Sequence, residues 1–99
     1  VIVGRNADYI LREFDHCLRV FIHADFEWRV ERMSRRMPDT PLEKLRMDVK
    51  SVDRARNAYC THYTGRHYAD ATNYDLTLCT SRLGMDAAFE QIIKAVEHI

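Results

Sequence analysis

The sequence predicts an α/β domain built on a parallel sheet, and three observations support this fold class. Three short apolar runs, at residues 1–3, 18–23 and 74–80, have the composition of β-strands. Helical segments separate these runs, and strands that are joined through helices pair in parallel. A parallel sheet is covered on both faces, and the predicted helices are too few to do this. We therefore expect that part of the domain lies outside these 99 residues.

The first half of the chain is predicted to contain a short helical turn and then a longer helix. Asn6 can cap a turn that runs to Leu11, and Asp25 can cap the helix after the second apolar run. That helix is expected to bury one apolar stripe, formed by Phe26, Val30, Met33 and Met37. Three arginines lie on a different face of it, namely Arg29, Arg32 and Arg36.

A long helix is predicted next, ending at about Thr64. Thr40 and Glu43 have the spacing of a capping box, and Pro41 suits the first helical position. Gly65 can adopt the left-handed conformation that ends a helix. The helix carries an apolar stripe with steps of three, four and seven residues, formed by Leu42, Leu45, Val49, Val52, Tyr59 and Tyr63.

Arg56 occupies a position where this apolar stripe should continue. A charge there is costly to bury unless it has a partner. Asp53 lies one turn earlier and could be that partner, or both residues could face an anionic ligand. Because the planar fork of arginine donates two hydrogen bonds to a phosphate, we interpret Arg56 as functional rather than structural. The arginines of the preceding helix, taken singly, fit a solvated helix face better.

The last third of the chain is predicted to hold a polar loop at residues 66–73, a strand and a helix. In the strand, Tyr74, Leu76 and Leu78 alternate with residues that face the other way. Asp86 can cap the final helix. The apolar face of that helix is formed by Phe89, Ile92, Ile93, Val96 and Ile99.

Composition narrows the class of protein. Hydrophobic residues make up 46% of the chain and charged residues 30%, which is typical of a folded domain. The net charge of +0 provides no overall field for nucleic acid or a membrane, although the middle of the chain is basic. Three cysteines without a CxxC motif favour reduced thiols and a cytoplasmic location. We expect no membrane span, and the His and Cys spacings indicate no metal site.

Two further features concern phosphate binding. Gly4 and Arg5 directly follow the first apolar run, at the end of a strand where α/β proteins bind ligands. By contrast, the chain contains no glycine-rich GxxxxGK loop followed by Ser or Thr. A nucleotide kinase needs such a loop, or an equivalent, to hold the phosphates of ATP.

Four segments, in this order, resemble the C-terminal half of the cytidylate kinase-like family, a branch of the P-loop nucleoside monophosphate kinases. Residues 1–5 (VIVGR) resemble the strand and Gly-Arg-Asp turn that meets the nucleotide substrate, and residues 23–33 (HADFEWRVERM) resemble a strand end followed by an arginine-rich helix. Residues 53–56 (DRAR) resemble the Asp-x-x-Arg of the lid. Residues 74–81 (YDLTLCTS) resemble the last strand and its polar ending. Together they cover nearly the whole chain.

The resemblance implies a three-layer, parallel-sheet fold of the P-loop kinase type, seen here without its P-loop strand and first helices. Residues 1–99 would be the C-terminal part of one nucleotide-kinase domain, with a lid at about residues 38–73. In this family the P-loop strand lies between the strands that correspond to residues 1–3 and 18–23. Its absence would leave a gap at the centre of the sheet.

The resemblance also implies roles for residues of the acceptor site and the lid. Arg5, with Asn6 beside it, would contact the acceptor nucleotide. The family has an aspartate where this chain has Asn6, and that aspartate helps to select cytosine, so this departure leaves the acceptor base open. Asp53 and Arg56 would close over the acceptor and the transferred phosphoryl group.

On the donor side, the resemblance places Arg29 and Arg32 near the donor nucleotide and Arg36 near its phosphates. Thr80 and Ser81 would approach the donor base through their backbone. The implied reaction is ATP-dependent phosphoryl transfer to a nucleoside monophosphate or a similar small acceptor, with Mg²⁺ bound to ATP. These 99 residues alone are expected to be inactive. Two alternatives are a non-catalytic nucleotide-binding or regulatory module, and a basic helical domain that contacts RNA phosphates.

Overall fold

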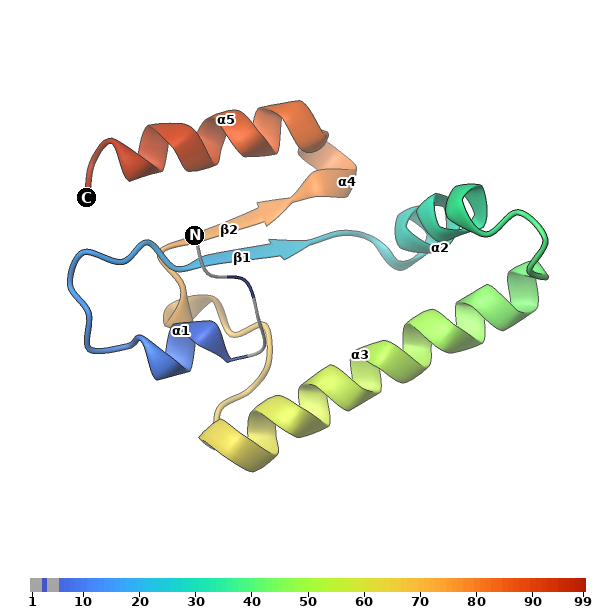
Figure 1. Ribbon diagram of the computed structural model, residues 1–99, viewed down its shortest axis with the longest axis horizontal. Helices are drawn as coiled ribbons and strands as arrows, with labels where there is room; N and C mark the ends of the chain where they lie inside the picture. Colours follow the sequence, from blue (N-terminus) through green and yellow to red (C-terminus); the bar gives the residue numbers. More distant parts are fainter. Residues whose placement is uncertain (1–2, 4–5) are drawn as a thin grey trace.

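The computed structural model describes residue 3 and residues 6–99, in which helices precede, separate and follow the strands β1 and β2 (Figure 1). In chain order the elements are α1 (Ala7–Ile10), β1 (Val20–His23), α2 (Phe26–Arg36), α3 (Leu42–Thr64), the 3₁₀ helix η1 (Ala71–Asn73), β2 (Leu76–Cys79), α4 (Thr80–Leu83) and α5 (Met85–Val96). The predicted mixture of helix and strand is thus confirmed. Residues 1 and 2 of the predicted first strand lie outside the described residues. The same holds for Arg5, which was predicted to contact the substrate.

The sheet consists of two parallel strands within the described part of the chain. β1 and β2 run in register from Val20, which lies opposite Leu76. Arg19 and Asp75 extend this pairing at the start of the strands. The amide of Arg19 donates to the Asp75 carboxylate over 2.8 Å, and its carbonyl accepts from the Asp75 amide, also over 2.8 Å. The parallel pairing predicted for these two strands is confirmed, and their carboxyl ends therefore meet.

The two central helices begin and end close to the predicted residues, but the predicted side-chain caps do not form. Asp25 occupies the N-cap position of α2 without a capping hydrogen bond from its side chain. α3 begins after Pro41, which is its N-cap residue rather than its first helical residue, and has no side-chain cap either. α5 begins at Met85, so Asp86 lies within its first turn. There the carboxylate still interacts favourably with the helix dipole.

Two glycines end helices. Gly65 follows α3 with a φ of 69°, which confirms the predicted left-handed end of that helix. The residues before Gly84 form the short helix α4. Gly84 adopts φ 84° and ψ 161°, a conformation that is essentially confined to glycine, and it turns the chain from α4 into α5. None of the described helices is both long and apolar enough to cross a membrane.

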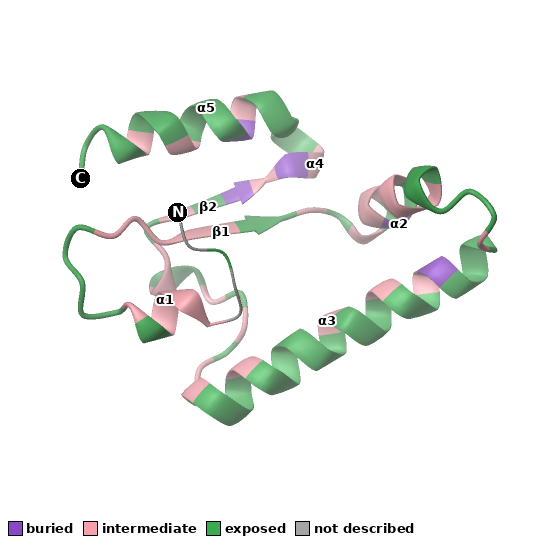
Figure 2. Ribbon diagram, viewed as in Figure 1, coloured by how far each residue is buried: buried purple, intermediate pink, exposed green. Residues whose placement is uncertain are grey.

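Buried residues are few, and they lie at two places in Figure 2. Val30 and Leu45, each 1% exposed, join α2 to the first half of α3, while Leu78 and Ala88 lie between β2 and α5. The other residues that were predicted to be buried are partly or largely exposed. The largely exposed ones include Ile22, Met37, Leu42, Val52, Tyr59, Tyr63, Phe89, Ile93, Val96 and Ile99. An apolar stripe is buried only where another element packs against it, and α2 covers only the first half of α3 (Figure 1).

Candidate functional site

The carboxyl ends of β1 and β2 are tied together by the two residues predicted to lie near a donor base. Thr80, which is 5% exposed, donates from its hydroxyl to the carbonyl of His23 over 3.4 Å. The hydroxyl of Ser81 accepts a hydrogen bond from the amide of Asp25 over 3.0 Å. Both bonds start from α4, which follows β2: one reaches the last residue of β1, and the other reaches the N-cap residue of α2. In parallel sheets this edge is where ligands bind.

Arg29 leaves this edge from the first turn of α2 and forms a two-point ion pair with Asp53 of α3. Its Nη1 and Nη2 atoms donate to the two carboxylate oxygens of Asp53 over 2.8 and 3.0 Å. Its Nε donates to the carbonyl of Ala24 over 3.1 Å. The hydrogen bonds to Asp53 are the main reason that the pKa of Arg29 lies above its ordinary value. Of the two possibilities considered for Asp53, pairing with Arg56 is therefore not the one found, because a partner from a different helix holds the carboxylate.

Arg32 and Arg36 are the other two arginines of α2 that were predicted to lie near the donor nucleotide, and they point in different directions. Nη1 of Arg32 lies 3.3 Å from the sulfur of Met85, and its guanidinium stands 5.6 Å from the centre of the Trp28 ring. Arg32 thus reaches from α2 to the first residue of α5, close to the strand ends. Arg36 is the last residue of α2 and is exposed. No residue in the described part of the chain pairs with it, and the structure does not bring it to Arg29.

A cavity of about 830 Å³ begins at the amino end of β1, where Leu18, Arg19 and Val20 line it, and its lining also includes Asn6 and Arg56. Asn6 precedes α1 in the left-handed conformation, with φ 61° and ψ 19°, and its side chain does not cap that helix as predicted. Arg56 is exposed rather than buried, and the described residues provide it with no hydrogen bond or ion pair. A residue predicted for the acceptor site and one predicted for the lid thus face the same space.

Aromatic side chains form one wall of this cavity. The ring of Phe21 lies 5.5 Å from that of Tyr68 and 5.0 Å from that of Tyr74. Burial raises the pKa of Tyr74 to about 12, with a further contribution from the negative charge of Asp8. Sequence reasoning assigned no site role to these rings. The signal was the density of tyrosines after α3, but their spacing alone did not show that they meet β1.

Arg66 is a second feature that sequence reasoning missed. It follows Gly65, and its Nη1 lies 3.5 Å from the carboxylate of Asp8 in α1. Its guanidinium also stands 4.9 Å from the centre of the Tyr9 ring. Arg66 therefore holds the end of α3 against α1, the helix that follows Asn6. Since Arg56 lies on α3, this contact fixes one side of the cavity relative to the other.

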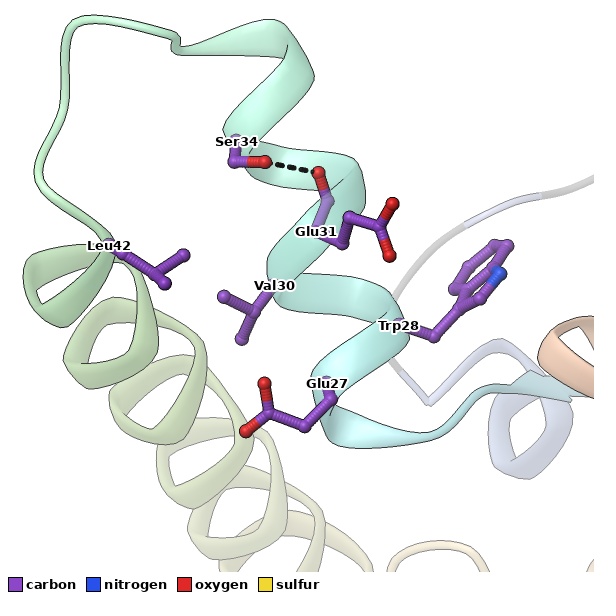
Figure 3. A pocket seen from close by; sticks show the side chains of 6 residues that line it. All are labelled: Glu27, Trp28, Val30, Glu31, Ser34 and Leu42. Atoms are coloured by element: carbon purple, nitrogen blue, oxygen red, sulfur yellow. Dashed lines mark hydrogen bonds between the residues drawn. The ribbon is translucent and has the colours of Figure 1, made fainter.

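A smaller cavity of about 510 Å³ lies between α2 and α3 (Figure 3). Val30 and Leu42 face each other across it, whereas Trp28 points away. Its polar residues include the carboxylates of Glu27 and Glu31, which would repel an anionic ligand. Among the residues that the structure describes, no group of three or more His, Cys, Asp or Glu could hold a metal ion.

Comparisons with known proteins agree on one family. The model of the cytidylate kinase-like family matches residues 1–82. The chain is 29% identical over 99 residues to cytidylate kinases from Thermococcus sibiricus and Pyrococcus furiosus, and it spans 50% of the length of each. The crystal structure of an uncharacterized protein from Eubacterium ventriosum matches with a TM-score of 0.91 and 26% identity, over all of this chain and 55% of that protein.

Proposed function

Since the chain belongs to the cytidylate kinase-like family, we propose that the intact protein transfers a phosphoryl group from ATP to a nucleoside monophosphate or a similar small acceptor. A cytidylate-like acceptor has the support of the relatives, both of which are cytidylate kinases. On this proposal residues 1–99 form the C-terminal part of one domain with the three-layer P-loop kinase fold. Residues 38–73 are its lid. The free thiols of Cys17, Cys60 and Cys79 suit a reaction in the cytoplasm.

The observation that carries the proposal is the position of Arg56 relative to Asn6. Both line one cavity, and the described residues leave the guanidinium of Arg56 without a counterion. An arginine fork that is open to an anion beside an amide and aromatic rings can bind a phosphate and a base. We assign this cavity to the acceptor nucleotide. Arg5, which precedes Asn6, is proposed to contact the same nucleotide.

The donor nucleotide is proposed to lie at the carboxyl ends of the strands. Thr80 and Ser81 are held there by their bonds to His23 and Asp25, so their backbone is fixed for contact with a base. Arg29 and Arg32 are proposed to supply positive charge at this edge, and Arg36 is proposed to reach the donor phosphates when the lid closes. Mg²⁺ is proposed to bind through the phosphates of ATP.

In this mechanism an oxygen of the acceptor phosphate attacks the γ-phosphorus of ATP, and ADP leaves in line. Catalysis of this kind depends on positioning and on cations around the charge of the transition state. Arg56 is proposed to donate its two N–H groups to the phosphoryl group in transfer. Asp53 is proposed to approach the acceptor when α3 moves with Arg56.

A coupled assay of ADP formation tests the proposal. The intact protein, with ATP and Mg²⁺, is supplied with CMP, dCMP, UMP or AMP in turn, and a reaction without acceptor measures background ATP hydrolysis. We expect ADP formation that depends on at least one acceptor and a phosphorylated acceptor in equal amount. Nucleotide binding without turnover for any acceptor would refute the enzyme and favour a non-catalytic nucleotide-binding or regulatory module. That module is the second candidate function.

A further inference from the structure

Within the described part of the chain, the ion pair between Arg29 and Asp53 is the last hydrogen-bonded ion pair between α2 and α3 along the length of α3. Before it along α3, Leu45 is 1% exposed, as is Val30 of α2, and Arg46 donates to Glu27 of α2 over 3.1 Å. After it, residues 54–59 are all exposed. Arg56, Tyr59 and Cys60 of α3 line the larger cavity. Just beyond the end of α3, Arg66 pairs with Asp8 of α1. The pair therefore marks the point where the helix leaves its support.

While Asp53 is bound, the guanidinium of Arg29 has no free pair of N–H groups that could donate together to a second anion. Nη1 and Nη2 donate to the carboxylate, and Nε donates to the carbonyl of Ala24. A phosphate that binds an arginine in the same two-point geometry uses the same pair of parallel N–H groups. Asp53 and a phosphate therefore compete for Arg29, because one fork cannot hold both.

The exchange is not prevented by burial. The side chain of Arg29 is 33% exposed and that of Asp53 is 40% exposed, so water can solvate the carboxylate once it is displaced. Pairs this exposed contribute modestly to stability, unlike buried ion pairs, whose disruption strands a charge. Asp53 and Arg56 lie on one helix, three residues apart, so they move together.

We propose that Asp53 is an internal competitor, whose carboxylate occupies the Nη1 and Nη2 donors of Arg29 in the absence of an anion. An incoming phosphate displaces this carboxylate from Arg29 and so releases the second half of α3 from α2. Anion binding at the strand ends is thereby coupled to the position of Arg56. The inference rests on the proposed function only in assigning Arg29 to the donor side. A ligand shifts an equilibrium by the difference of its affinities for the two states, and here the difference arises from the single fork of Arg29.

The test uses inorganic pyrophosphate as the probe and the intact protein. Its dissociation constant is measured by calorimetry for the wild type, Asp53→Asn and Asp48→Asn. Asp48 is a matched control, since it lies on the same helix and pairs with Lys44 over 2.9 Å. Because the competitor is gone, Asp53→Asn should bind pyrophosphate about three- to tenfold more tightly, with Asp48→Asn within about twofold of the wild type. Equal or weaker binding by Asp53→Asn overturns the proposal.

Amide hydrogen exchange separates displacement from a simple loss of negative charge. In the wild type, saturating pyrophosphate should speed exchange in residues 53–60, since this part of α3 loses the ion pair that ties it to α2. In Asp53→Asn these amides should exchange at the faster rate already, and pyrophosphate should change it little. Unchanged exchange in the wild type, or no binding of millimolar pyrophosphate, overturns the proposal. Neither readout requires turnover, so an intact protein that fails the kinase assay still decides it.

Discussion

Replacing Arg56 by lysine tests the residue on which the proposed reaction depends most. Arg56 is exposed, and the described part of the chain offers it no ion pair, so the free energy of unfolding should change by less than about 0.5 kcal/mol. Lysine keeps the charge but loses the fork. Removing one donor to a transition-state oxyanion costs about 10²–10³ in kcat, and the retained charge should limit the loss to about 10–100-fold. That corresponds to about 1.4–2.7 kcal/mol in the activation free energy.

The coupled assay should show this loss in kcat, with the acceptor KM within about twofold, because the lost bond forms mainly in the transition state. Arg54→Lys is the matched control. Arg54 is also exposed on α3, but two residues along a helix point to nearly opposite sides, and Arg54 does not line the cavity. The interpretation is refuted if Arg56→Lys turns over normally, or if both variants lose activity equally. A lowered melting temperature for Arg56→Lys would assign it a structural role instead.

Two other predictions concern stability. Leu45→Ala should lower the free energy of unfolding by about 2–4 kcal/mol in a urea titration, because Leu45 is 1% exposed, while Met47→Ala at a 71% exposed position should cost less than about 0.5 kcal/mol. A loss below about 1 kcal/mol for Leu45→Ala would contradict this expectation. Burial raises the pKa of Tyr74 from 10.0 to about 12. The contribution of the neutral Tyr74 phenol to the free energy of unfolding is therefore complete below pH 10 and is lost as the pH rises toward 12. In an absorbance titration one phenol should ionise late, and Tyr74→Phe should remove it; an unchanged titration curve would exclude the raised pKa.

The elements were predictable because local pattern determines them. The steps of three and four residues in α2 and α3, and the alternation in residues 74–80, reflect the geometry of helix and strand directly. The left-handed Gly65 was predictable for the same reason, since few other residues adopt that conformation. Burial was not predictable, because it depends on what packs against a face. Val52 and Tyr63 continue the stripe of Leu45, yet they are 43% and 62% exposed.

The partner of Asp53 shows why side-chain contacts are harder to predict than elements. By spacing alone, Arg56 is a suitable partner on the same helix face. Arg29 lies 24 residues away in sequence, and only the packing of α2 against α3 brings its fork to the carboxylate. Contacts within one helix cannot be ranked against contacts between helices until the crossing of the two helices is known. The same limit hid Arg66, whose partner Asp8 belongs to α1.

This exchange of partners changes the reason for regarding Arg56 as functional. An arginine at an apolar position would need a counterion if it were buried, but an exposed guanidinium is solvated by water and needs none. The interruption of the stripe is therefore no argument for function by itself. The stronger argument is positional: because Asp53 is held by Arg29, Arg56 remains open to an anion in the cavity that Asn6 and the ring of Tyr74 also line. The proposed acceptor nucleotide offers both a phosphate and a base to this mixed lining, and a simple inorganic anion does not.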